Sequence, residues 1–307
     1  MSERAILITG ATGFIGPHVV RALRARGDTV WIWARDVAKA RQLLDVNVVG
    51  DLAQIPADAP IHGIVNLAGA PVVGPPWTRA RRKLLIDSRV KPTQALLEWS
   101  ATRAEPPRAV VSASAIGFYG SGGEDWLTED SPPQDGFQSQ LCVAREIAAN
   151  AAESQGMRAV NLRFGLVFGR DGGIYPRFAL AAKLGGAAVL GNGRQWMSWI
   201  HIGDLVRVIE TALDDESMRG AVNTVAPEPV RQRDFQRALT RALHRPLWLR
   251  VPARCLRFGL GEMAELLLSS QRVAPRRLLE AKFDYSCLTP EDALRDLTGK
   301  PRISRGV

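Results

Sequence analysis

The chain has 307 residues, of which 46% are hydrophobic and 23% charged, a balance that is ordinary for a folded globular protein. The first residues lead directly into a predicted strand, and they lack the basic segment followed by an apolar core that marks a secretory signal. No run of eighteen uncharged apolar residues occurs either, so we expect neither a secretory signal nor a membrane span. The three cysteines are too few and too scattered for a disulfide framework or a zinc site, which predicts no bound metal and a cytoplasmic location.

The net charge of +9 comes mostly from arginine, with basic clusters at 79–83 and 276–277. No nucleic-acid-binding motif accompanies these clusters, and arginines spread over helices commonly form a solvated face, so we expect no nucleic-acid partner. A basic cleft for a phosphorylated cofactor or an anionic substrate is the favoured use of the excess charge.

A glycine-rich turn follows the first predicted strand, Ala5–Gly10. Gly10 permits the tight turn, Gly13 lets the backbone approach a phosphate, and Gly16 lets the following helix pack close to the strand. The free N–H groups and positive dipole at the helix N-terminus suit the pyrophosphate of a dinucleotide. The alternative is a structural turn that needs glycine for geometry alone, since the G-x-x-G-x-x-G spacing differs from the pattern of most dehydrogenases.

The second predicted strand, Thr29–Arg35, ends about 20 residues past the glycine turn, where the adenosine ribose lies in dinucleotide-binding folds. An acidic residue there accepts hydrogen bonds from the ribose hydroxyls of NAD, but this chain has Arg35 first and then Asp36. A guanidinium suits a 2′-phosphate by charge and by its forked hydrogen bonds, which favours NADP(H). In the alternative, Asp36 binds the ribose and Arg35 is solvated.

Further strand-like and helical runs continue this alternation along the chain. The predicted strands cover 46–51, 63–69, 108–114 and 158–167, and a long helical stretch covers 79–100. Strands that alternate with helices predict an α/β fold with a doubly wound parallel sheet, a Rossmann fold. We assign residues 1–170 to this NADP(H)-binding domain.

Past residue 170 the alternation breaks, and glycine pairs indicate loops. A late strand near 221–226 is predicted to return to the sheet, and helices are predicted over 233–243 and 253–268. Residues 171–307 therefore form a smaller, mainly helical lobe in our prediction. We expect a small-molecule substrate in the cleft between the two parts, over the carboxyl ends of the strands.

Several motifs together resemble the extended short-chain dehydrogenase/reductase superfamily: TGATGFIG at 9–16, NLAG at 66–69 and SASAIGFYG at 112–120. More narrowly, the chain is similar to the branch called epimerase family proteins, which resemble nucleoside-diphosphate-sugar epimerases. That similarity rests on RFGLV at 163–167, WIHIGDL at 199–205 and NTVAP at 223–227. The resemblance runs the whole length of the chain and implies a Rossmann fold with NADP(H) as the cofactor.

Carried over position by position, the resemblance implies a set of cofactor-binding residues. The pyrophosphate falls on the glycine turn, the 2′-phosphate on Arg35, the adenine beside 51–52, and the ribose and phosphates over 67–69, while Arg89 reaches the cofactor from the following helix. The complete set is Gly10, Thr12, Gly13, Phe14, Ile15, Gly16, Arg35, Asp51, Leu52, Leu67, Ala68, Gly69 and Arg89. For Arg89 the alternative is an ion pair on the helix surface, with Asp87 or a neighbouring residue.

The chain departs from the superfamily at the residues that carry the chemistry. Active members use a tyrosine and a lysine four residues apart on one helix face, where the lysine and the cofactor lower the pKa of the tyrosine so that it can move a proton. At these two places this chain has Gln138 and Cys142. Glutamine has no useful pKa and a thiol carries no fixed positive charge, so neither residue can take over the role.

Two hydroxyl groups remain as candidate catalytic residues. Ser114 ends the fifth predicted strand, where the superfamily places its catalytic hydroxyl, and Tyr119 follows five residues later as a substitute proton donor. In the alternatives, the Ser114 hydroxyl forms a hydrogen bond with its own backbone, and the Tyr119 ring only packs against its neighbours.

Three functions are consistent with these residues. The first is an NADP(H)-dependent oxidoreductase that acts on a small carbonyl or related unsaturated substrate through a non-standard proton donor. The second is a catalytically silent NADP(H)-binding redox sensor, which the missing tyrosine and lysine favour. The third is a nucleotide-sugar epimerase or dehydratase, ranked last because its chemistry relies on the missing pair. The sequence leaves the oligomeric state open between a monomer and a homodimer.

Overall fold

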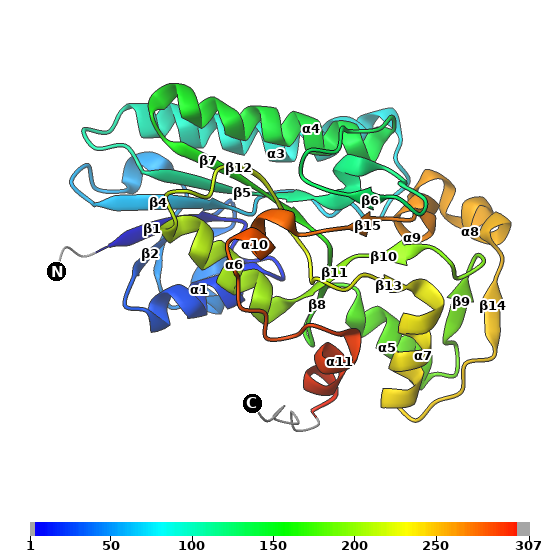
Figure 1. Cartoon of the computed structure of the whole chain (residues 1–307). Helices are drawn as coiled ribbons and strands as arrows, with labels where there is room; N and C mark the ends of the chain where they lie inside the picture. The colour runs from blue at the N-terminus through cyan, green and yellow to red at the C-terminus, as the bar shows by residue number, and fades with distance from the viewer. Residues whose placement is uncertain (1–3, 300–307) are drawn as a thin grey trace.

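A seven-stranded parallel sheet forms the centre of the computed structural model, which describes residues 4–299 (Figure 1). Its strand order is β12–β7–β5–β4–β1–β2–β3, so the direction of travel across the sheet reverses between β3 and β4. The strands are β1 (Ala5–Thr9), β2 (Thr29–Trp33), β3 (Asn47–Val49), β4 (Ile61–Asn66), β5 (Ala109–Ala115), β7 (Arg158–Phe164) and β12 (Gly220–Thr224). The predicted doubly wound Rossmann fold is confirmed.

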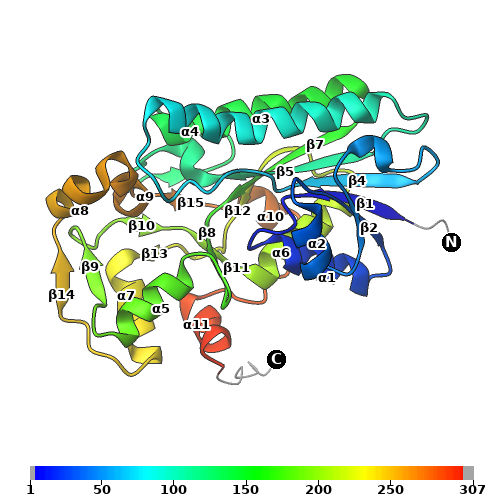
Figure 2. The same ribbon diagram turned by 180° about the vertical axis from the view of Figure 1, so that it is seen from behind.

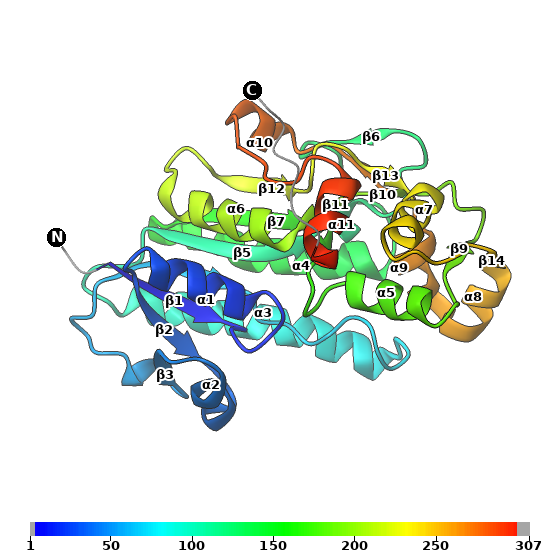
Figure 3. The ribbon, with the colours of Figure 1, turned by 90° about the horizontal axis from the view of Figure 1, so that it is seen from below.

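Helices cover both faces of the sheet because its strands are apolar on both sides. Side chains of a strand alternate between faces, so Ile6 and Ile8 of β1 pack with α1 (Gly16–Ala25) and α6 (Ile202–Asp214), whereas Leu7 packs with α3 (Arg79–Ala101). Helix α4 (Phe137–Asn150) lies beside α3 on that second face, and Figure 3 shows α1 and α6 together on the other. The remaining helix of this part, α2 (Val37–Leu43), follows β2 directly.

A second lobe lies beyond the carboxyl ends of the sheet strands (Figure 2). Its core stacks the rings of Phe168, Trp199 and Phe235, with ring centroids 5.3 and 4.9 Å from that of Phe168. The lobe contains α5 (Tyr175–Lys183), α7 (Gln232–Ala242), α8 (Ala253–Leu260), α9 (Glu265–Leu268) and α11 (Pro290–Thr298).

Short two-stranded pairs join this lobe to the sheet domain and brace it internally. Three pairs are parallel and the β10–β13 pair is antiparallel. They are β8 (Leu166–Phe168) with β11 (Trp199–His201), β9 (Ala188–Leu190) with β14 (Leu249–Val251), β6 (Trp126–Leu127) with β15 (Arg272–Val273), and β10 (Trp196–Met197) with β13 (Val230–Arg231).

Of the predicted elements past residue 150, one is confirmed and two need adjustment. The late strand does return to the sheet, as β12 beside β7. The predicted strand 158–167 ends at Phe164, and the residues after Gly165 form β8, which pairs with β11 outside the main sheet. The predicted helix 253–268 is broken at Gly261, whose φ of 56° ends α8, because the left-handed region cannot continue a right-handed helix.

The predicted division at residue 170 stays a prediction, since the later chain returns to the sheet domain. Helix α6 and strand β12 pack into its main core, and α10 (Arg276–Glu280) contacts β12. Within residues 4–299, no helix is both long and apolar enough to span a bilayer.

Candidate functional site

A cleft of about 790 Å³ runs over the carboxyl ends of β1, β2 and β4. It meets the glycine turn on one side and the middle of α3 on the other. The predicted cofactor residues on its wall are Gly10, Thr12, Gly13, Arg35, Leu67, Ala68 and Gly69. The topological switch of the sheet, between β1 and β4, lies at this cleft, which is where ligands bind in open α/β sheets.

The glycine turn has the geometry that a dinucleotide phosphate requires. Gly10 has a φ of 72°, and a Cβ atom there would lie 2.6 Å from the backbone of Leu67. At Gly16 a Cβ atom would overlap the backbone of Ala11. Gly13 is exposed on the cleft wall, and helix α1 begins three residues later without a side-chain cap, so the positive end of its dipole lies at this turn.

Two cations stand where the adenosine ribose is expected. Arg35 and Lys39 are exposed and line the cleft at the end of β2. Asp36 accepts a hydrogen bond from the Lys39 backbone N–H at 2.9 Å, which caps helix α2. The Asp36 carboxylate thus serves as a helix cap, while the two positive charges face the space in which a 2′-phosphate would lie.

The predicted adenine residues line an adjoining groove of about 920 Å³, which shares Trp33 and Ala95 with the cofactor cleft. Asp51 and Leu52 lie on its wall. The Asp51 carboxylate accepts the Ala53 backbone N–H at 3.0 Å and caps a single 3₁₀ turn, so the side chain positions this wall.

The last three residues of the predicted pyrophosphate loop stand behind the cleft. Phe14, Ile15 and Gly16 are absent from its wall among the described residues. The Phe14 ring instead fills the space above Gly169 and Gly172, where a Cβ atom would collide with it. These residues therefore shape the turn and its contact with the β8 loop.

A second cavity, of about 230 Å³, opens beside the cofactor cleft between β5, α3 and α4; below, it is called the inner cavity. Ser114 lies on its wall with Gln138 and Cys142, the two residues at the superfamily's tyrosine and lysine places. Arg89 lines the inner cavity as well, where its guanidinium donates hydrogen bonds to the carbonyls of Leu85 and Ala70. Arg89 forms no ion pair with Asp87, whose partners are Lys83 and Lys91.

Ser114 belongs to a buried charge network behind the cavity wall. Its Oγ donates to Glu146 Oε1 at 2.6 Å. Arg163 binds the same carboxylate in a two-pronged pair, with distances of 2.9 and 2.8 Å to the two oxygens. Because the pair is bidentate and buried, the carboxylate is held in one orientation toward Ser114.

Tyr119 lies away from both cavities, and this geometry does not support the predicted role as proton donor. The side chain is fully buried. Its hydroxyl donates to Asn223 Oδ1 at 2.6 Å and accepts from Arg163 at 2.8 Å. Burial raises the pKa of Tyr119 to about 12, since the loss of water outweighs the nearby Arg163 charge. Tyr119 therefore holds Arg163, which in turn holds Glu146.

The two replaced positions do not restore the missing chemistry. Burial, with a smaller contribution from the Glu146 charge, raises the pKa of Cys142 to about 11, so the thiol stays protonated and neutral. The amide of Gln138 borders the cavity near Gly117 and does not titrate near neutral pH, so it cannot act as a general acid or base.

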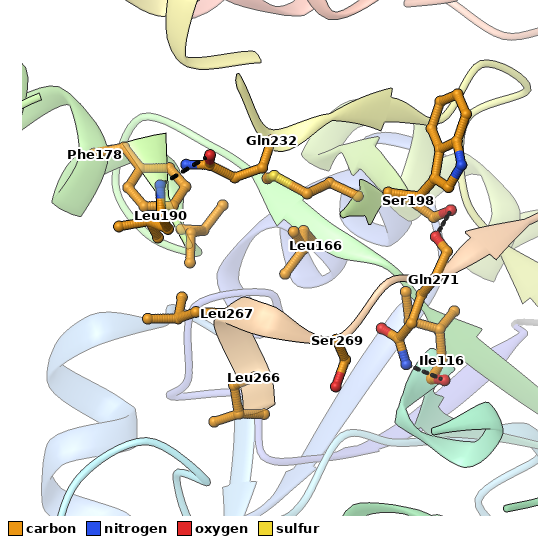
Figure 4. A pocket seen from close by; sticks show the side chains of 13 residues that line it. Ile116, Leu166, Phe178, Leu190, Ser198, Gln232, Leu266, Leu267, Ser269 and Gln271 are labelled. Atoms are coloured by element: carbon orange, nitrogen blue, oxygen red, sulfur yellow. Dashed lines mark hydrogen bonds between the residues drawn. The ribbon is translucent and has the colours of Figure 1, made fainter. Parts of the chain in front are cut away.

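A further small cavity of about 30 Å³ extends the inner cavity into the second lobe (Figure 4). The two share Ile116, Leu166, Leu266 and Gln271. Its small volume suits water rather than a part of a substrate.

Comparison with known proteins agrees with this arrangement. Residues 6–224 match the model of the NAD dependent epimerase/dehydratase family. The chain belongs to that family. Residues 251–297 also match a model for a domain of unknown function, which begins at β14 and ends in α11.

Relatives in this family match nearly the whole chain. Epimerase family protein YfhF of Bacillus subtilis is 33% identical over 296 residues, which is 95% of this chain and 97% of that protein. A chloroplastic epimerase family protein of Arabidopsis thaliana is 33% identical and covers 96% of this chain and 86% of its own. The human epimerase family protein SDR39U1, crystallised with NADPH, superimposes with a TM-score of 0.85 at 28% identity and covers 96% of this chain and 99% of its own. The predicted family is confirmed.

Several residues of this family member's site were not predicted from its sequence. Lys39, Arg145, Glu146, Arg163 and Gln271 all take part in the cavities or in the network behind them. One signal was present for Glu146, because it continues the helix face of positions 138 and 142 by one more turn. The described residues contain no cluster of three or more histidine, cysteine or acidic side chains that could hold a metal ion.

Proposed function

We propose that this protein binds NADP(H) in the 790 Å³ cleft and is an oxidoreductase for a small carbonyl or related unsaturated substrate. Three observations support NADP(H) there: the glycine turn that a side chain would fill, the uncapped N-terminus of α1, and the cations of Arg35 and Lys39 at the end of β2. The human relative crystallised with NADPH also supports this choice over NAD(H).

The observation that carries the proposed chemistry is the contact between Ser114 and Glu146. When bound, the nicotinamide supplies or accepts a hydride. Ser114 lines the inner cavity and donates its single proton to Glu146, so its oxygen has a lone pair left to accept a further hydrogen bond. It takes the proton of a substrate alcohol as its own proton moves to Glu146 Oε1, and both protons move back when a carbonyl is reduced. Ser114 is then the catalytic residue, and Arg163 and Tyr119 position Glu146.

The size of the inner cavity favours a small substrate. Ligand sites for drug-sized molecules measure about 300–1,000 Å³, whereas this cavity measures about 230 Å³. A nucleotide sugar, the substrate of the epimerase alternative, requires more space, and the tyrosine and lysine on which that chemistry relies are replaced here by Gln138 and Cys142.

The test is a panel of small aldehydes, ketones and enones assayed by NADPH absorbance, with UDP-glucose as a nucleotide-sugar control. We expect NADPH to be consumed with at least one small carbonyl and none with UDP-glucose. Conversion of UDP-glucose without net NADPH oxidation contradicts the proposal and favours an epimerase.

A silent NADP(H) sensor is the second candidate, favoured by one observation, the neutral residues Gln138 and Cys142 at the two catalytic places. It predicts tight NADPH binding, measured by calorimetry, without turnover of any carbonyl in the panel. Turnover that depends on Ser114 excludes it.

A further inference from the structure

The inner cavity carries positive charge on a wall that is otherwise neutral. Arg145 and Arg89 both line it, and none of the described residues on its wall is aspartate or glutamate. Most of the others are apolar, including Trp77, Phe137 and Leu141. Two cations facing an apolar cavity require an explanation, because charged side chains are rarely buried without a partner of opposite sign.

Arg145 is the more deeply placed of the two, with 6% of its surface exposed. Its Nη2 donates to the Asn66 carbonyl at 2.7 Å and its Nε to Ser112 Oγ at 3.4 Å, and both acceptors are neutral. Burial lowers the pKa of Arg145, and the nearby charge of Arg89 lowers it further. The guanidinium therefore loses hydration without gaining a counter-charge from the described residues.

The nearest acidic group on the same helix already has a partner of opposite charge. The Glu146 carboxylate accepts two hydrogen bonds from the Arg163 guanidinium and one from the Ser114 hydroxyl. The Cys142 thiol beside it stays protonated, because burial raises its pKa to about 11. Neither group supplies the negative charge that Arg145 lacks.

Arg89 adds a second positive charge on the side of the cavity that faces the cofactor cleft. Its guanidinium lies against Gly69, and it donates to the carbonyls of Ala70 and Leu85 at 3.1 and 2.9 Å. Burial lowers the pKa of Arg89 as well. Both arginines thus favour an anion in the space between them.

The wall of the cavity also offers a neutral acceptor. The Gln271 Nε2 donates to the Ile116 carbonyl at 2.9 Å (Figure 4) and to the Gly120 carbonyl at 2.8 Å, which leaves its Oε1 to accept a hydrogen bond. Leu166 and Leu266 line the same cavity. The cavity wall therefore combines two cations, apolar side chains and one neutral acceptor.

We propose that the substrate of this cavity is a small organic carboxylate whose two oxygens bind Arg145, with its apolar body toward Leu166 and Leu266. This assignment rests on the proposed oxidoreductase function and names its substrate class. A planar carboxylate fits the forked donors of a guanidinium, and the limited volume favours it over a larger phosphorylated compound.

The test compares carboxylates with their neutral amides on the NADPH-saturated protein by calorimetry. The matched pairs are formate with formamide, acetate with acetamide, and benzoate with benzamide, so that at least one carboxylate fits whatever the shape of the cavity. We expect at least one carboxylate to bind more tightly than its amide. Substitution Arg145→Gln should weaken that carboxylate about tenfold or more, the effect of losing a hydrogen bond to a charged group.

Arg158→Gln is the matched control. Arg158 is equally buried and donates to the carbonyls of Ala212 and Met218, but it lies on neither cavity wall. Carboxylate binding should be unchanged in this variant. If Arg145→Gln does not fold, Arg145→Met replaces it, because exchanging a buried charge for an apolar side chain of similar length is often tolerated.

The outcomes separate this assignment from the proposed function. A separate NADPH titration tests cofactor binding, and its failure counts against the proposed function alone. Equal binding of all three carboxylates and their amides, or undiminished carboxylate binding after Arg145→Gln or Arg145→Met, overturns the assignment. A loss of NADPH affinity in these variants, with no carboxylate effect, assigns Arg145 to the cofactor and also overturns it.

Discussion

At the scale of single residues, Glu146 links the reacting position to the protein interior. It accepts the Ser114 proton on one side and the Arg163 guanidinium on the other, and Tyr119 supports that guanidinium from behind. A serine hydroxyl alone is a poor proton carrier, so in the proposed mechanism the oriented carboxylate next to it supplies the acid–base function. We expect the two cations at the end of β2 to act at the same scale, on the choice of cofactor.

Removing the Ser114 hydroxyl should reduce turnover far more than changing the former tyrosine and lysine places. We expect Ser114→Ala to lower kcat by about 10²–10⁴-fold, the range for losing a general acid or base. Gln138→Ala and Cys142→Ala should change it much less. Tyr119→Phe should also have the smaller effect, because its hydroxyl is away from the cavity. Steady-state rates with the best carbonyl of the panel measure this, and a larger loss in Tyr119→Phe than in Ser114→Ala contradicts the assignment.

Arg35 should set the preference for NADPH over NADH. Arg35→Ala should weaken NADPH binding by about 1.5–3 kcal/mol, the size of a hydrogen bond to a charged group, and leave NADH nearly unaffected. Lys39→Ala should act in the same direction, because Lys39 lines the same part of the cleft. Calorimetry with both cofactors measures the effect, and an equal loss for NADPH and NADH rules out a 2′-phosphate contact.

At the scale of elements, the turn between β1 and α1 contains two glycines that are needed for different reasons. Gly16 is needed for packing, because a side chain there would overlap Ala11, whereas Gly13 is open toward the cleft. A side chain at position 13 meets only the Gly10 carbonyl, at 3.3 Å. Folding and cofactor binding can therefore be separated within one turn.

Gly13→Val should abolish NADPH binding while the protein stays folded, because the side chain fills the space that the pyrophosphate needs. Gly16→Val should instead lower the melting temperature strongly. Gly259→Ala is the control, since no atom lies within 4 Å of a Cβ there. Circular dichroism and NADPH titration separate the two effects, and unchanged NADPH affinity in Gly13→Val would place the phosphates elsewhere.

At the scale of the whole molecule, the two lobes meet around the inner cavity. Gln271, next to β15, bonds the carbonyls of Ile116 and Gly120 in the sheet domain, while Ser198 of the second lobe bonds the Gln271 carbonyl at 2.8 Å. Near the same seam, Glu124 receives hydrogen bonds from Arg231 at 2.6 Å and from the Trp196 indole at 3.1 Å. These contacts join segments more than 70 residues apart.

The Glu124 contact should make part of the stability depend on pH. Hydrogen bonds from Arg231 and then from Trp196 lower the pKa of Glu124 from its ordinary value of 4.5 to about 2. A lowered folded-state pKa stabilises the fold above the unfolded-state value, so this contribution is lost as the pH falls from about 4.5 toward 2. Over this pH window, the melting temperature of Glu124→Gln should fall less steeply than that of the parent protein. Above pH 5 the melting temperatures of the two proteins should depend on pH in the same way. An identical acid profile for both proteins refutes the contribution.

The sequence by itself determined the parts of this protein that depend on local order. Strands, helices and the glycine turn follow from short-range patterning, and so does the position of Arg35 at the end of β2, because neighbours in sequence remain neighbours in space. The tertiary structure decided which side chains meet. Ser114 and Glu146 are 32 residues apart, and Tyr119 and Asn223 are 104 apart, so only the packing of β5, α4, β7 and β12 shows that one hydroxyl faces the cavity and the other is buried. Burial itself is a property of the packed whole, and for that reason the unpaired charge of Arg145 is visible only in the folded molecule.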